Sequence, residues 1–239
     1  MKTVKSALFV VALALALALV TGAGRAHAKG ASKAYHPRID PADFQTGVNN
    51  PYLPLVPGTS YKYLEKEGKH VRENEVTVTG DKKVIMGVSC TVVHDVVREK
   101  GELKEDTYDW YAQDKSGNVW YFGEDTKEFH GPNKVDTEGS WEAGVGPNQP
   151  GIIMPGEPKM GEIFRQEYGP GHAEDMGQVI AHVQTVTVPA GTFQDCLETK
   201  EWSLLEPGHE NKWYAKGVGV VRTESTRKEI ATLVSMTKP

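Results

Sequence analysis

The chain has 239 residues, of which 25 % are charged and 38 % hydrophobic, and a formal net charge of −5. That length is enough for one large domain or two small ones with a real core. The basic residues are scattered among acidic ones, whereas nucleic acids and anionic lipid surfaces are bound by clustered basic patches, so neither is an expected partner.

The N-terminal residues have the three parts of a secretory signal. Lys2 and Lys5 precede an unbroken apolar run of 14 residues at positions 7–20, and the small-residue triplet at 26–28 provides a cleavage site. This pattern predicts a signal peptide over residues 1–28 and an exported protein, periplasmic or extracellular. A membrane-spanning helix needs about 20 apolar residues, so neither this run nor any later one predicts a membrane span.

Residues 29–57 are expected to form an extended strap over the surface of the domain. Their five prolines exclude a long helix, and at most one helical turn could begin at Asp40. Tyr52, Leu53 and Leu55 are the side chains expected to pin the strap.

From residue 58 onward the chain is expected to form β-strands. Residues that favour strands alternate with polar ones, and turn-forming residues separate the runs. The predicted strands are 59–66, 71–79, 83–86, 89–98, 103–113 and 118–123, followed by 162–168, 178–188, 192–203, 210–215, 218–225 and 228–236. No window after the signal has a convincing helical period, so long helices are not expected.

Residues 130–160 interrupt the strand pattern. They are rich in glycine and proline but also contain apolar side chains such as Trp141 and Ile153, which a flexible linker does not need. We expect a long ordered loop that packs on the sheet, and loops of this kind often form lids or binding loops.

The two strand-rich segments resemble each other. Gly58 and Gly161, and likewise Trp110 and Trp213, stand 103 positions apart. An internal duplication explains these matches better than chance does. The sequence therefore predicts an all-β, mainly antiparallel fold, in which a duplicated β-meander (58–129 and 161–236) forms one curved sheet or half-barrel over residues 58–239.

Cys90 and Cys196 occupy roughly matching places in the two repeats. In an oxidising compartment the only two cysteines of a chain are a candidate disulfide. A bond would require their Cα atoms to lie within about 7 Å. Two separate, small buried side chains are the alternative.

No established catalytic or cofactor motif is present, so we expect no cofactor, and no histidine spacing predicts a metal site. Two acidic segments could do acid–base chemistry if they converge in one pocket. They are Glu124 with Asp125, and Glu174 with Asp175.

Aromatic residues offer a second candidate site. Trp110, Trp120 and Phe122 lie on two strands joined by a short turn, and Trp141 and Met154 lie in the following loop. These five side chains could bind an apolar ligand inside a curved sheet. Ordinary core packing under the loop is the alternative.

Several segments together resemble a widespread family of uncharacterised secreted bacterial proteins. They are NPYLPLVPGT at 50–59, DWYAQD at 109–114, GNVWYFGE at 117–124, GSWEAG at 139–144 and AEDM at 173–176. The resemblance covers nearly all of the chain after the signal and implies no catalytic residue. The repeated meander is also distantly similar to the half-barrel of periplasmic lipoprotein carriers, a likeness of fold that does not fix function.

The sequence thus favours a non-enzymatic binding or carrier module for an apolar small molecule or an envelope protein. A structural or interaction protein of the cell envelope is the alternative. A carboxylate-based or metal-assisted hydrolase that uses the acidic segments is a weaker one.

Overall fold

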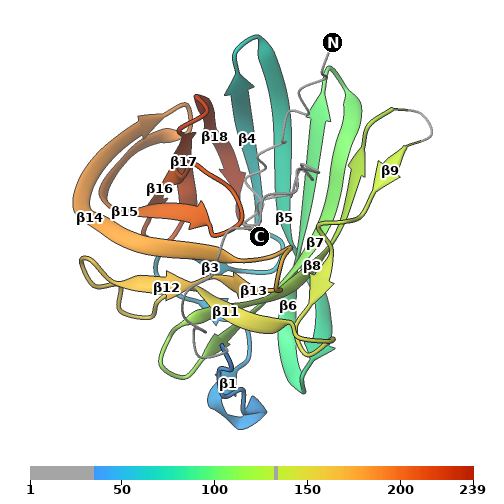
Figure 1. Cartoon of the computed structure of the whole chain (residues 1–239). Coiled ribbons are helices and arrows are strands. Elements are labelled where there is room, and N and C mark those ends of the chain that lie inside the picture. Colours follow the sequence, from blue (N-terminus) through green and yellow to red (C-terminus); the bar gives the residue numbers. More distant parts are fainter. Residues whose placement is uncertain (1–34, 132–133) are drawn as a thin grey trace.

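The computed structural model describes residues 35–131 and 134–239, and 16 of its strands form one large antiparallel sheet that curves almost into a closed barrel (Figure 1), while β2 and β3 pair with each other in a small separate sheet. The strand order is β12-β14-β15-β16-β17-β18-β4-β5-β6-β7-β8-β11-β13. The strands are β1 (Phe44–Gln45), β2 (Val48–Asn49), β3 (Pro54–Leu55), β4 (Ser60–Glu67), β5 (His70–Ile85), β6 (Val88–Glu99), β7 (Glu102–Asp114), β8 (Val119–Phe129), β9 (Val135–Asp136), β10 (Trp141–Glu142), β11 (Gln149–Met154), β12 (Ile163–Arg165), β13 (Glu167–Tyr168), β14 (Asp175–Val188), β15 (Gly191–Ser203), β16 (Glu210–Ala215), β17 (Gly219–Ser225) and β18 (Glu229–Thr237). The prediction of an all-β, antiparallel half-barrel is confirmed.

One predicted turn was wrong. Residues 80–82 have the composition of a hairpin turn, but the structure runs one strand, β5, straight through them. The pairing of β5 with β6 shifts register between Val78 and Lys82, so the extra residues form a bulge. The hairpin turns later, at Met86 and Gly87, where both residues have positive φ.

The N-terminal strap crosses the surface in short pieces. Asp40 caps the single 3₁₀ turn Pro41–Asp43 with its side chain, and β1 then adds to β7. Asn50 fixes the strap because its side-chain amide donates to the carbonyls of Gly117 (3.0 Å) and Pro155 (3.1 Å). Tyr52, Leu53 and Leu55 are buried in the core cluster.

The segment between the two strand-rich regions belongs to the sheet. The three strands β9, β10 and β11 all pair with β8. Gly123 makes this approach possible, because a Cβ atom at that position would lie 2.2 Å from the carbonyl oxygen of Trp141. The strand β10 runs antiparallel to β8, and Trp141 lies opposite the buried Glu124, so its ring is on the same buried face.

The barrel nearly closes where β11 and β13 approach β12 and β14. The backbone N–H of Gln166 donates to the carbonyl of Asp175 (2.8 Å). Gly151 on β11 passes so close to Gln166 that a Cβ would lie 2.3 Å from its carbonyl carbon. A glycine is therefore required at the seam.

Cys90 on β6 and Cys196 on β15 are free thiols. The disulfide that the sequence suggested between them is absent, so that prediction was wrong. Five strands separate β15 from β6 in the sheet, and each strand spacing is about 4.8 Å. Each thiol is buried and donates to a nearby backbone carbonyl, Val88 for Cys90 and Phe193 for Cys196. The fallback interpretation, two small buried side chains, agrees with this placement.

The two predicted repeats have corresponding strand orders. The strands of the first are neighbours in the order β4-β5-β6-β7-β8, and those of the second in the order β12-β14-β15-β16-β17, while β13 lies at the opposite edge of the sheet. The turn glycines are bonded alike, because Gly58 N–H donates to Val78 and Gly161 N–H donates to Val179, both at 2.8 Å. The common origin of the two halves stays a prediction. So does the signal peptide, which lies outside the described residues, and within those residues no helix is long and apolar enough to cross a membrane.

Candidate functional site

The inner face of the barrel is polar, which is unusual for the buried face of a sheet. Along β7 every second side chain from Glu105 to Gln113 is buried, and along β16 the buried set includes Glu210 and Lys212. Of the buried charged side chains among residues 35–131 and 134–239, ten are carboxylates and two are cations. The carboxylates are Glu65, Asp95, Glu105, Asp109, Glu124, Glu167, Asp175, Glu201, Glu210 and Glu229.

A deep carboxylate cluster lies where β7, β8 and β13 face each other. It consists of Asp109, Glu124 and Glu167, each at most 5 % exposed. Asp109 and Glu124 are direct partners in the β7–β8 pairing. Burial is the main reason why the pKa of each of these carboxyls is raised, to about 7 for Asp109, and repulsion from neighbouring carboxyls adds to the shift of Glu124 and Glu167.

Three aromatic rings surround this cluster. The Tyr121 hydroxyl donates to Asp109 at 2.7 Å. The rings of Tyr111 and Tyr121 stack with centroids 5.0 Å apart, and Trp141 meets Tyr121 edge-on at 5.3 Å. The indole of Trp141 also opposes part of the rise in the pKa of Glu167. The Tyr121 hydroxyl therefore supplies Asp109 with a hydrogen bond, while the ring faces of Tyr111 and Tyr121 pack on each other.

A second acidic group continues along β6 and β7. Asn74 donates to Asp95 at 2.9 Å, and Thr107 donates to Glu105 at 2.8 Å. Burial is again the largest cause of the raised pKa of both carboxyls, followed for Asp95 by repulsion from Glu105 and Asp109. The second oxygen of Asp95 and one oxygen of Glu167 are buried without a hydrogen-bond donor.

The buried cations lie nearer one end of the barrel, the rim at which the β4–β5, β6–β7 and β17–β18 hairpins turn. Lys212 contacts Glu201 at 2.9 Å and Glu210 at 2.8 Å. Arg72 contacts Glu229 at 3.1 Å and Glu67 at 3.4 Å. Both cations are therefore already matched by carboxylates.

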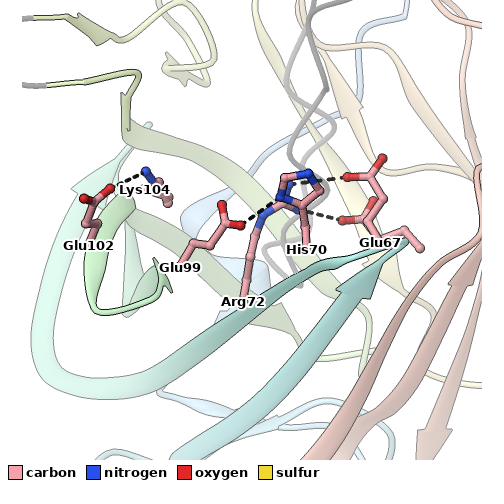
Figure 2. A network of polar contacts seen from close by, with 7 residues as sticks. Glu67, His70, Arg72, Glu99, Glu102 and Lys104 are labelled. Atoms are coloured by element: carbon pink, nitrogen blue, oxygen red, sulfur yellow. Dashed lines mark hydrogen bonds and ion pairs between the residues drawn. The ribbon is translucent and has the colours of Figure 1, made fainter.

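Figure 2 shows the outer part of the rim, where Arg72 reaches towards Glu67 and His70 bonds to Glu99 at 2.8 Å. Burial, with repulsion from Glu65, raises the pKa of Glu229 to about 8, although Arg72 opposes the rise. These contacts tie β4, β5, β6 and β18 together at the rim.

The structure brings together half of the acidic site that was predicted from sequence. Glu124 and Asp175 both lie inside the barrel, and repulsion from Asp175 contributes to the raised pKa of Glu124 and of Glu167. Asp125 and Glu174, next to them in sequence, point away, because successive side chains on a strand alternate between faces. Asp125 is exposed, and Glu174 accepts a hydrogen bond from the backbone of Gly171 in a loop.

The predicted aromatic site divides between the two faces of the sheet. Trp110, Trp120 and Phe122 lie on the outer face, where Phe44 of the strap contacts Trp120 and Phe122 with ring centroids 6.3 and 5.7 Å apart. The ammonium of Lys83 covers Trp110 at 3.3 Å from the ring centroid. Trp141 and Met154 pair with inward-facing residues of β8 and lie on the inner face.

Several interior carboxyls were not singled out from the sequence, namely Glu65, Asp95, Glu105, Asp109, Glu167, Glu201, Glu210 and Glu229. One signal was available in the sequence. Glu105, Thr107, Asp109 and Tyr111 occupy every second position, so they form one row of the strand, but the alternating row also contains aromatic residues. Within the described part of the chain, no three of its His, Cys, Asp and Glu side chains are arranged to hold a metal ion.

No family model and no curated protein sequence matches the chain. Among solved structures, a proposed lipoprotein from Parabacteroides distasonis is similar with a TM-score of 0.38 and 14 % sequence identity, over 81 % of this chain and all of that one. A likeness this distant supports no argument about function. The resemblance to a family of secreted bacterial proteins therefore stays a prediction.

Proposed function

We propose that the protein is an exported, non-enzymatic binding protein that holds a polar ligand inside the barrel. The observation that supports this most strongly is the inner face itself, where the described residues include ten buried carboxylates and two buried cations. Burying polar groups costs free energy unless partners compensate, so a protein with no use for them would keep an apolar interior.

The ligand class differs from the apolar one suggested by the aromatic residues. Trp110, Trp120 and Phe122 are packed under the strap and Lys83, where they stabilise the outer face. The inner face instead presents carboxyl, hydroxyl and amide groups, which favour a ligand rich in hydrogen-bond donors.

Native mass spectrometry of the exported protein tests this proposal. The protein should carry a mass above that of its processed chain, and unfolding should release a small molecule into the aqueous phase. Recovery of the ligand in an organic extract instead would indicate an apolar ligand. A protein with no excess mass would contradict the proposal and favour a structural or interaction role in the envelope.

A carboxylate-based hydrolase is a second candidate, because Asp109, with a pKa of about 7, adjoins Glu124, whose pKa is also raised by burial and by repulsion from Asp109. Neighbouring carboxyls with raised pKa values are typical of acid–base sites. A hydrolase of this kind should lose its activity in Asp109→Asn and have a bell-shaped pH profile. No turnover across ester, amide and glycoside substrates would count against it.

A further inference from the structure

We propose that the deep carboxylate cluster of Asp109, Glu124 and Glu167 is a binding site for an organic ammonium group. This inference rests on the proposed function and names the chemical class of the ligand.

Charge is the first argument. Asp109 is close enough to raise the pKa of both Glu124 and Glu167, and Lys212, a cation that acts on Glu167, is already bonded to Glu201 and Glu210. Without another cation, burial favours the protonated form of these carboxyls. A cationic ligand can take the place of those protons.

The unpartnered acceptors are the second, independent argument. One oxygen of Glu167 lies without a donor in a side chain that is 1 % exposed, and one oxygen of Asp95, which repels Asp109, is in the same situation. Buried acceptors in proteins are almost always hydrogen-bonded. An ammonium group offers three N–H donors and one positive charge, which these oxygens lack.

Binding must be coupled to proton release. Because burial raises the pKa of Asp109 to about 7, this carboxyl is partly protonated at neutral pH, and a bound ammonium favours its ionised form. If one proton leaves per ammonium bound, the affinity should rise by up to tenfold per pH unit below the pKa of the cluster.

Isothermal titration calorimetry of the full mature protein with n-butylammonium tests the inference, with n-butanol and butyrate as neutral and anionic probes of the same length. Titrations in phosphate and in MOPS, which differ in ionisation enthalpy and contain no primary ammonium, give the number of protons released. We expect butylammonium alone to bind, with about one proton released and with tighter binding at pH 8 than at pH 6.

The matched variants are Glu124→Gln, inside the barrel, and Asp125→Asn, its exposed neighbour. The first should weaken butylammonium binding at least tenfold, and the second should change it less than twofold. Circular dichroism verifies folding, and if Glu124→Gln fails to fold, the proton count on the unmodified protein still decides.

Equal binding of butanol, binding without proton release, or no binding at millimolar concentration would each overturn the ammonium site. None of these results would remove a polar ligand detected by mass spectrometry. The failure of this inference and the failure of the proposed function are therefore distinguishable.

Discussion

Replacing Lys212 by methionine should destabilise the protein strongly. Lys212 is a buried cation, and its ammonium contacts Glu201 at 2.9 Å and Glu210 at 2.8 Å. Removing one partner of a buried ion pair leaves an uncompensated charge and costs about 3–5 kcal/mol. For a chain of this size that corresponds to a fall in melting temperature of about 6–20 °C.

The deficit should also depend on pH. Burial acts to raise the pKa of Glu201, but Lys212 and the hydrogen bonds to Glu201 outweigh it, so the pKa is lowered. The stability that this carboxylate contributes is present above its unfolded pKa and is lost as the pH falls through the folded one. The two proteins should therefore differ fully at pH 7 and much less at pH 4.

Urea denaturation of the mature protein at both pH values measures this difference. Lys66→Met is the control, because Lys66 is exposed on β4 and its loss should change stability by no more than about 0.5 kcal/mol. A deficit below about 1 kcal/mol at pH 7, or one that is the same at pH 4, would refute the assignment of Lys212 as the charge partner of Glu201.

Three further predictions concern the whole protein. Burial raises the folded pKa to about 7 for Asp109 and to about 8 for Glu229. The free energy of unfolding should therefore decline from pH 5 to pH 8, by about 1.4 kcal/mol per pH unit for each of these carboxyls that is protonated only in the folded state. A melting temperature that stays constant or rises over this range would contradict this prediction. Asn50→Ala should cost about 3 kcal/mol in urea denaturation, since it removes several buried hydrogen bonds at once, and a loss under 1 kcal/mol would show that the strap is held by its apolar side chains alone. Thiol counting on the unfolded, unreduced protein should find Cys90 and Cys196 both free, whereas the absence of free thiols would reinstate the disulfide.

Strand alternation was enough to predict the architecture but not which face of each strand lies inside. On β7 the inward row contains Glu105, Asp109 and Tyr111, and the outward row contains Trp110 and Ala112, which are also buried. Hydrophobicity alone would place the tryptophan inside. The acidic interior could not be predicted because the strap and Lys83 cover the outer face, and such coverage depends on contacts between distant segments.

Turn composition was informative only where the backbone needed it. Gly80 belongs to a run with turn chemistry, yet it is not among the glycines with positive φ, and β5 continues through it. Gly123 and Gly151 matter for a different reason, since backbone from another segment occupies the place of their missing Cβ atoms. The sequence shows neither requirement, because both depend on which strands meet at the closing seam.

The central claim is that inward-facing acids hold the ligand, and its most direct test is native mass spectrometry of three exported proteins purified in parallel. The unmodified protein and Asp125→Asn should both carry the same excess mass, traceable to a small polar molecule. Folded Glu124→Gln should lack that mass. Equal excess mass in all three proteins, or a ligand found only in the organic extract, would contradict the claim.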